Sequence, residues 1–416
     1  MTPGTGHRPS GHRRLAALIT AGLVDSLCLS VAWTVLVLRI ADEHGLAAVG
    51  VVSAAMLVGV ALSAPIAGRV AVQLDGRRLL RTAAGVEMVL RVGLALLVVS
   101  GAPVLVLALC TTAMNVSAWT GYAGMRAEVA AVRPGAAALT WYGTAIAAVE
   151  AAGVAVAAFL PTGTRVEDTV FVAVVIAYVL GLLPTVVVAG ASPVRRAARA
   201  AARTRLQAPP GLAVLGALLM LLGSAPTLLY VALAEEAHGR TAVAAAAVAF
   251  VAGSLLAGPA ASALQRRRGP AGPRYALAAV GMVAGWVVAP VSVPLLCAAQ
   301  VLSGLCMTLL EGLLDSTAAA REPQRVTAAL ASVTAGRALG SAAGTAVLPL
   351  VVLQTGLPVA AAGATAGLLV LAALTIGLQR RPSTSAHRGD VVRRIPAASL
   401  PPVPRPPARV APLPVG

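Results

Sequence analysis

The chain has 416 residues, of which 58% are hydrophobic and 11% are charged. Soluble domains carry about 25% charged residues, so a chain this long lacks the solvated surface of a soluble enzyme, a disulfide scaffold or a disordered protein. The net charge of +17 comes from arginine alone, because the sequence contains no lysine. Aromatic residues, at 3%, are too few for base stacking, so we read this charge as membrane topology and expect no nucleic-acid binding.

A membrane-spanning helix needs about 20 apolar residues, and the sequence contains twelve such stretches. They cover residues 15–39, 46–67, 79–101, 103–123, 136–160, 169–190, 211–233, 242–264, 275–290, 292–314, 327–352 and 357–379. The ninth and tenth are almost continuous and are separated at Ala289-Pro290. We therefore expect an all-α polytopic membrane protein.

The arginines indicate the orientation of these spans. With a cytoplasmic N-terminus, 27 of the 32 arginines fall in cytoplasmic segments, and only Arg39, Arg165 and Arg240 fall outside. This bias follows the positive-inside rule and places both termini in the cytoplasm. Abundant Ala, Arg and Gly without lysine are typical of a GC-rich bacterial genome, so we expect a multi-pass protein of the bacterial cytoplasmic (inner) membrane.

Composition divides the chain into five segments. They are a cytoplasmic tail (1–14), a six-helix bundle (15–190), a basic linker (191–209), a second six-helix bundle (210–380) and a Pro/Arg-rich tail (381–416) that we expect to be disordered.

The two bundles repeat each other weakly. His44-Gly45 and Pro65 recur as His238-Gly239 and Pro259 at an offset of 194, and Ala138-Leu139 and Gly153 recur as Ala329-Leu330 and Gly344 at an offset of 191. Offsets that are nearly constant at corresponding spans indicate two pseudo-repeated bundles with a binding site between them, near the bilayer midplane.

The loop after the second span carries a recognisable motif. It runs Gly68-Arg69-Val70-Ala71-Val72-Gln73-Leu74-Asp75-Gly76-Arg77-Arg78-Leu79-Leu80-Arg81. With twelve spans in two repeated halves, this loop resembles that of the major facilitator superfamily, which reads Gly, two variable residues, Ala, Asp-Arg, a variable residue, Gly and several basic residues. Val72 and Gln73 stand where the family has its acid and its arginine, and Asp75 lies three residues further on.

The resemblance implies a cytoplasmic gating loop, formed here by Gly68, Asp75, Gly76, Arg77, Arg78 and Arg81. In the family this loop is a charge latch that stabilises the outward-facing state. The style is closest to bacterial efflux-type members, although the arginine that drug antiporters often carry in span four and the glycine motif with proline in span five are both missing.

Charged residues within spans are costly and predict function. Asp25 lies near the middle of span one, on a polar arc with Ser30 and Trp33, and the resemblance implies that span one lines the central cavity. We predict that these three bind substrate or, at Asp25, a proton; the alternative for Asp25 is burial against Arg91. Glu87 and Arg91, at i and i+4, predict a structural ion pair, with a charge relay as the alternative.

The remaining charges within spans need partners across helices. Glu150 and Arg337 are further candidates for substrate or proton binding, and Arg337 has Asp25, Glu150 or an anionic substrate group as possible partners. Glu311 and Asp315, another i, i+4 pair, predict an interfacial latch, with substrate contact as the alternative.

These features predict a monomeric secondary-active transporter that exports a small apolar or cationic compound by alternating access, driven by proton exchange. A buried carboxyl group loads and releases a proton near neutral pH more readily than an exposed one. An importer or facilitator that holds an anionic metabolite through Arg337 is the alternative, and a scaffold acting through the C-terminal tail is a third possibility. Single cysteines and the lack of a Ser/His/Asp set or phosphate loop predict no enzyme, metal or cofactor.

Overall fold

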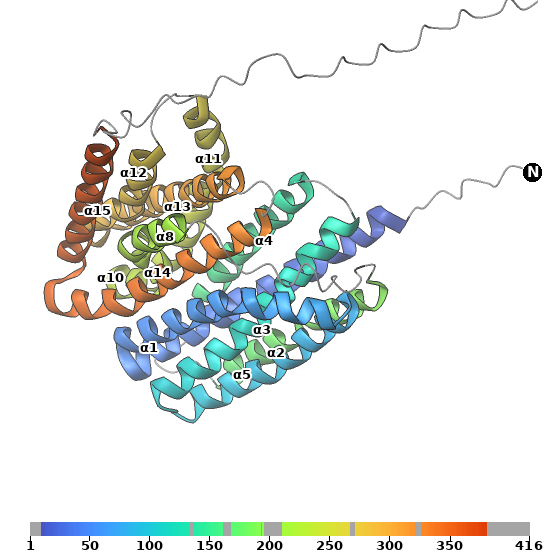
Figure 1. Ribbon diagram of the computed structural model, residues 1–416. Coiled ribbons are helices and arrows are strands. Elements are labelled where there is room, and N and C mark those ends of the chain that lie inside the picture. The colour runs from blue at the N-terminus through green and yellow to red at the C-terminus, as the bar shows by residue number, and fades with distance from the viewer. Residues whose placement is uncertain are drawn as a thin grey trace, which may run out of the picture. The chain divides into compact units, whose positions relative to one another are not determined.

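The computed structural model describes residues 10–132, 136–160, 168–192, 194, 210–266, 271–321 and 326–380, and these residues are almost entirely helical (Figure 1). The first half contains α1 (Ser10–Gln73), α2 (Gly76–Val99), α3 (Val104–Val132), α4 (Ala136–Ala158), α5 (Asp168–Leu180), α6 (Leu183–Val188) and the 3-10 helix η1 (Ala189–Ala191). The second half contains α8 (Pro210–Gly223), α9 (Ala225–Leu228), α10 (Tyr230–His238), α11 (Arg240–Arg266), α12 (Ala271–Ala284), η2 (Gly285–Val287), η3 (Ala289–Val291), α13 (Val293–Arg321), α14 (Val326–Thr355) and α15 (Leu357–Arg380).

Helix α1 contains two of the predicted spans. Gly45 interrupts it at φ 78° and ψ 173°, a conformation that residues with a Cβ rarely adopt. Gly239 makes the same break between α10 and α11, at φ 81° and ψ 175°. The repeated His-Gly pair therefore has one backbone geometry in both halves.

The number of spans agrees with the sequence. In the part of the chain that the structure describes, nine helices are long and apolar enough to cross a membrane, and two shorter apolar helices cover Ala145–Ala158 and Gly211–Gly223. Because α1 holds two spans, these helices supply the twelve predicted ones, and the all-α polytopic fold is confirmed. The ninth and tenth spans separate where predicted, at η3 and the extended residue Ser292.

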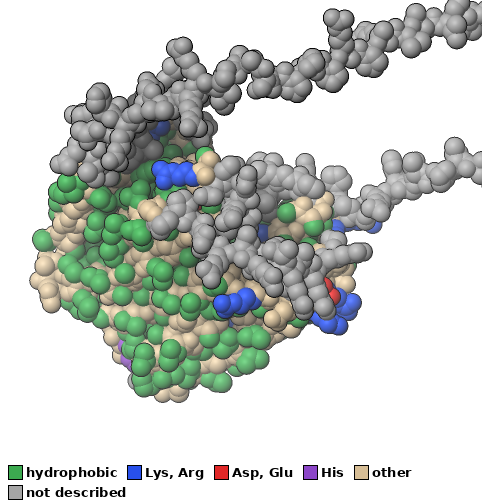
Figure 2. Space-filling model, in the orientation of Figure 1, with side chains coloured by type: hydrophobic (Ala, Val, Ile, Leu, Met, Phe, Trp, Pro, Cys, Tyr) green, Lys and Arg blue, Asp and Glu red, His purple; other side chains and the backbone are tan. Residues whose placement is uncertain are grey.

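Large apolar side chains cover the outside of the helices. Val89, Leu105 and Leu353 have exposed fractions of 72%, 69% and 68%. Figure 2 shows hydrophobic side chains spread over the visible face, with few charged ones among them. Apolar exposure this extensive suits contact with lipid tails rather than with water.

The repeat extends to helix packing. A Cβ on Gly153 of α4 would lie 2.9 Å from the carbonyl oxygen of Leu27 on α1. A Cβ on Gly344 of α14 would lie 2.5 Å from the carbonyl oxygen of Leu221 on α8. Since Leu27 and Leu221 are 194 residues apart, the fifth span packs on the first as the eleventh packs on the seventh.

The two halves contact each other through α1 with α14 and through α4 with α11. A Cβ on Gly50 would lie 2.6 Å from both the carbonyl oxygen of Thr345 and Cγ of Pro349. Only a glycine allows this approach of the second span to the eleventh.

The five predicted segments stay a prediction. Residues up to Ile376 form one compact unit, and Gly377–Gly416 form another, of which the structure describes only the end of α15. The predicted tail 381–416 lies outside the described residues, as does the linker 191–209 apart from Ala191, Ser192 and Val194.

Candidate functional site

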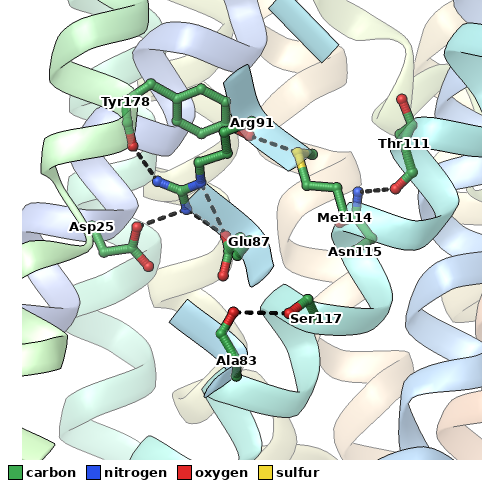
Figure 3. A network of polar contacts seen from close by, with 9 residues as sticks. All are labelled: Asp25, Ala83, Glu87, Arg91, Thr111, Met114, Asn115, Ser117 and Tyr178. Carbon is green, nitrogen blue, oxygen red and sulfur yellow. Dashed lines mark hydrogen bonds and ion pairs between the residues drawn. The ribbon is translucent and has the colours of Figure 1, made fainter. Parts of the chain in front are cut away.

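Arg91 on α2 is the centre of a buried charge network (Figure 3). Its side chain is 0% exposed, and its Nη2 donates to Oδ1 of Asp25 at 2.8 Å and to Oε1 of Glu87 at 2.5 Å. Its Nη1 donates to the backbone carbonyl of Tyr178, and the guanidinium carbon lies 4.1 Å from the centre of the Tyr178 ring. One cation thus joins α1, α2 and α5 through charge-assisted bonds and a ring contact.

Glu87 and Arg91 are in contact, as expected for the predicted ion pair. Asp25 is also paired with Arg91, which was the alternative to its role in substrate or proton binding. The Asp25 side chain is 25% exposed, whereas that of Glu87 is 5% exposed. Two carboxyl groups share one guanidinium, so ionisation of both leaves one unbalanced negative charge. A buried unbalanced charge is costly, and the pair therefore has a place for one further positive charge.

A cavity of about 250 Å³ lies beside this network. It is lined by Asp25, Ser26, Leu29, Glu87, Asn115, Ala118, Trp119, Tyr122, Gly143, Ile146, Ala147 and Glu150. All of these residues belong to α1, α2, α3 and α4. The wall contains three carboxyl groups and, within the described part of the chain, no arginine, and the rest of it is largely apolar and aromatic. A few polar groups in an apolar wall are typical of a small-molecule site.

Glu150 is the third carboxyl group of this cavity. Within the residues that the structure describes, its side chain has no hydrogen bond and no ion pair. The nearby amide of Asn115, in contrast, donates to the carbonyl oxygen of Thr111 at 3.0 Å and is held in place. Glu150 is therefore the carboxyl group of the cavity that is open to a new partner.

A second cavity, of about 40 Å³, touches the same network. It is lined by Gly22, Asp25, Ser26, Leu80, Ala84, Glu87, Ala118, Gly121, Tyr122, Met125, Tyr142, Leu182 and Thr185. The two cavities share Asp25 and Glu87 in their walls.

Two further predicted site residues on α1 lie elsewhere. Ser30 is buried against α4, where a Cβ added to Gly153 would lie 2.7 Å from Cβ of Ser30. Trp33 packs on the main hydrophobic core. Neither is among the described residues that line the two cavities, so of the three predicted site residues Asp25, Ser30 and Trp33 only Asp25 reaches a cavity.

The predicted gating loop ends in a helix cap. Oδ1 of Asp75 accepts from the backbone N–H of Arg78 at 2.8 Å, so Asp75 is the N-cap of α2. Arg77, Arg78 and Arg81 are exposed, and Nε of Arg81 donates to the carbonyl oxygen of Val186 at 3.4 Å. Gly68 is exposed, with open space around it.

The buried acid beside this loop is Glu128, which the sequence analysis missed. Its Oε2 accepts from Nη2 of Arg14 at 2.7 Å, and its Oε1 accepts from the hydroxyl of Ser192. Gly76 packs against it, where a Cβ would lie 2.7 Å from Oε1 of Glu128. Predicted span four stopped at residue 123, but α3 continues to Val132, and this extension carries Glu128 into the interior. Glu128 follows Met125 by three residues, which places both on one face of the helix, and this spacing was the signal in the sequence.

Arg337 on α14 pairs within the second half. Its Nη1 lies 3.2 Å from Oδ1 of Asp315 and donates to the backbone carbonyl of Glu311 at 3.2 Å, and its Nη2 donates to Oγ1 of Thr334 at 3.3 Å. Arg337 thus pairs with neither Asp25, which is held by Arg91, nor Glu150, and its contact with an anionic substrate group stays a prediction. Glu311 and Asp315 come together around Arg337, and their role as a latch stays a prediction.

Solved transporter structures share this architecture. The xylose transporter XylE from E. coli, in an inward open conformation, matches at a TM-score of 0.64 over 91% of this chain and 98% of that chain, with 13% identity. The peptide transporter POT, in complex with alafosfalin, matches at 0.66 over 91% and 96%, with 12% identity. The human organic anion transporter MFSD10 matches at 0.59 over 88% and 99%, with 16% identity.

The chain has the major facilitator fold. No protein-family model matches its sequence, and neither does any curated protein. Identities this low establish the fold of the chain and leave its substrate and the efflux-type style as predictions. In the major facilitator fold, binding sites lie near the bilayer midplane at the interface of the repeats. Asp25 and Glu150 lie near the middle of their spans, but all described residues that line the larger cavity belong to the first half, so the predicted site between the bundles stays a prediction.

Proposed function

We propose that the chain is a secondary-active transporter that exports a small apolar or cationic compound in exchange for protons. The observation that carries this proposal is the cavity of about 250 Å³ with Asp25, Glu87 and Glu150 in its wall. A compound with a positive group and an apolar body fits this wall, because the carboxyl groups attract its charge while Trp119 and Ile146 offer apolar surface.

The exchange follows from the chemistry of a carboxyl group. A carboxylate binds either a proton or a cationic group, so arrival of one releases the other. Alternating access requires two halves that rock around a fixed site, and the major facilitator fold supports this motion. Export then follows when protons enter from the side on which they are more concentrated.

We assign the first contact with the compound to Glu150, because its carboxyl group has no partner within the described residues. Asp25 is the second contact, since it is partly exposed in the cavity and shares Arg91 with Glu87. On this proposal the protein is a monomer in the bacterial cytoplasmic membrane, and both termini and the loops and linker that together carry 27 of its 32 arginines lie in the cytoplasm.

Transport of ethidium, an aromatic monovalent cation, into inverted membrane vesicles tests the proposal. Uptake should require a pH gradient, and Asp25→Asn should abolish it. Glu236→Gln, at an exposed position on α10, is the matched control and should transport normally. Uptake that persists in Asp25→Asn, or that needs no gradient, would rule out the proposed coupling.

An importer that holds an anionic metabolite through Arg337 is the second candidate. It is supported by the burial of Arg337 and by the likeness to a protein named as an organic anion transporter. It has the weaker support, because Arg337 is already paired with Asp315 and is not among the residues that line the two cavities. Uptake of an organic anion by whole cells that is lost in Arg337→Gln, without any export of cations, would favour it.

A further inference from the structure

The smaller cavity and the larger one adjoin at the Asp25–Glu87 pair, where Ser26, Ala118 and Tyr122 also line both, and they extend from it in different directions. Along α1 and α2 the smaller cavity contacts Gly22 and Ala84, which precede the pair, whereas the larger one contacts Leu29, which follows it. Both α1 and α2 start at the predicted cytoplasmic face, so the smaller cavity extends from the pair toward that face.

The other helices agree with this placement. On α3, which ends at the predicted cytoplasmic face, the smaller cavity contacts Met125, and the larger one contacts Asn115, further from that end. On α4, which starts there, the smaller cavity contacts Tyr142 and the larger one reaches Glu150. The sixth span, which ends there, contributes Thr185 to the smaller cavity alone.

The smaller cavity has the size and polarity for water. Its volume of about 40 Å³ exceeds the roughly 10–15 Å³ that one water molecule needs. A buried water also needs two to four polar partners. The carboxyl groups of Asp25 and Glu87 and the hydroxyl groups of Thr185, Tyr122 and Tyr142 supply such partners. The cavity is too small for the compound that the larger one would hold.

We propose that the Asp25–Glu87 pair exchanges its proton with the cytoplasm through water in this smaller cavity, on a path separate from the one that the compound takes. The inference rests on the proposed function. The carboxyl O–H bond breaks, its proton passes to a water oxygen, and the carboxylate keeps the electron pair. Arg91 stays charged and balances the other carboxylate, so one proton moves in each exchange.

The separation has a consequence for coupling. Since Glu150 lies only in the wall of the larger cavity, a cation bound there leaves the smaller cavity free. The proton that Asp25 releases when the cation reaches it then has a route to the cytoplasm that the compound does not fill. Among the described residues, the titratable or charged groups near the pair are Arg91, Tyr178, Cys28, Tyr122, Tyr142 and Glu150.

Two variants disturb the smaller cavity in different ways: one fills it and the other removes a polar group from its wall. Ala84→Leu fills it, because Ala84 is buried and lines it. Thr185→Val keeps the size of the side chain and removes a hydroxyl group from the wall. Thr111→Val is the matched control, since the Thr111 hydroxyl is buried, has no hydrogen bond and lies at neither cavity.

Infrared spectroscopy after a rapid drop in pH measures proton exchange in the purified protein without any substrate. The carboxyl band of the pair, identified by its loss in Glu87→Gln, should appear about tenfold more slowly in Ala84→Leu and Thr185→Val, which is roughly the rate that loss of one hydrogen bond along the path costs, and at the normal rate in Thr111→Val. Equal rates in all three variants would overturn the inference. Thr185→Val alone decides the matter if Ala84→Leu does not fold.

Ethidium transport separates this inference from the proposed function. Both cavity variants should slow transport driven by a pH gradient and leave exchange of labelled for unlabelled ethidium at equal pH unchanged. Equal slowing of both processes would overturn the inference, because the smaller cavity would then act on the compound. Failure of the wild type to move ethidium would instead count against the proposed function, and the infrared result would still decide the proton path.

Discussion

The two halves of the molecule share their packing and differ in their charges. Gly153 and Gly344 contact backbone carbonyls that are 194 residues apart, yet the residues around them have diverged. At the same offset Asp25 corresponds to Leu219, which is buried. At the offset of 191 Glu150 corresponds to Ser341, whose hydroxyl is hydrogen-bonded to that of Ser224 at 2.9 Å.

The charges of the second half also have a different setting. Arg337 has a partner, Asp315, whose side chain is 40% exposed, whereas Arg91 is enclosed with Asp25 and Glu87. In the second half, water can stabilise the charge of Asp315. In the first half, the charges of Arg91 and Glu87 are stabilised mainly by other protein groups. Close glycine contacts thus persist in both halves because backbones must approach there, while the chemistry of the cavity belongs to one half.

The largest expected effect is the removal of Arg91. Arg91→Met leaves two carboxyl groups near each other in the interior without their cation, and loss of one partner of a buried ion pair costs about 3–5 kcal/mol. Arg337→Met should cost less, because the carboxyl group that it leaves unpaired, Asp315, is 40% exposed and water can stabilise its charge. Thermal unfolding in detergent compares the two.

Equal losses of stability in the two variants would contradict the contrast between the halves. The double variant Asp25→Asn, Glu87→Gln added to Arg91→Met should restore part of the stability, because it removes the carboxyl charges that Arg91 balances. Absence of any recovery would mean that Arg91 acts mainly through its contacts with Tyr178.

The sequence could predict the spans and the repeat because both depend on local patterns. Apolar runs of helix length define the spans, and the His-Gly pairs mark turns that need a positive φ at Gly45 and Gly239. A glycine needed for a turn or a close approach leaves the same signal in both halves, and no tertiary information is required to read it.

The partners of the charged residues could not be predicted in the same way. Glu128 meets Arg14 across 114 residues and Ser192 across 64, and such contacts depend on how helices are arranged. Arg337 was expected to reach Asp25 or Glu150, but a residue on the adjacent α13, Asp315, lies nearer. Periodicity places a side chain on a helix face, and only the packing decides what that face meets.

A smaller effect is expected from the paired glycines. Gly344→Ala and Gly153→Ala each force a Cβ against a backbone carbonyl, and overpacking of this kind costs about 1–3 kcal/mol. The loss should be greater for Gly344, whose Cβ would come closer to its carbonyl. Gly312→Ala is the control, because a Cβ there meets nothing within 4 Å. If either paired variant unfolds at the same temperature as Gly312→Ala, the close glycine contact at that position does not contribute to stability, which contradicts the proposed packing repeat.

The smallest expected effect concerns Asp75, which lies three residues after the position of the acid in the family motif that this loop resembles. As the N-cap of α2, Asp75 accepts from the N–H of Arg78, and replacement of a cap by alanine costs about 1 kcal/mol. Asp75→Asn should keep the stability, because Asn caps helices as well as Asp does.

The asparagine variant also separates the cap from the predicted charge latch. If Asp75 acts only as a cap, Asp75→Asn transports ethidium normally while Asp75→Ala is slightly less stable. If its charge holds the loop in the outward-facing state, Asp75→Asn loses transport at unchanged stability. We expect the first result, because the partner of Asp75 is a backbone N–H. The contacts that join α1, α3 and the residues after α6 belong instead to the buried acid at this loop, Glu128, which binds Arg14 and Ser192.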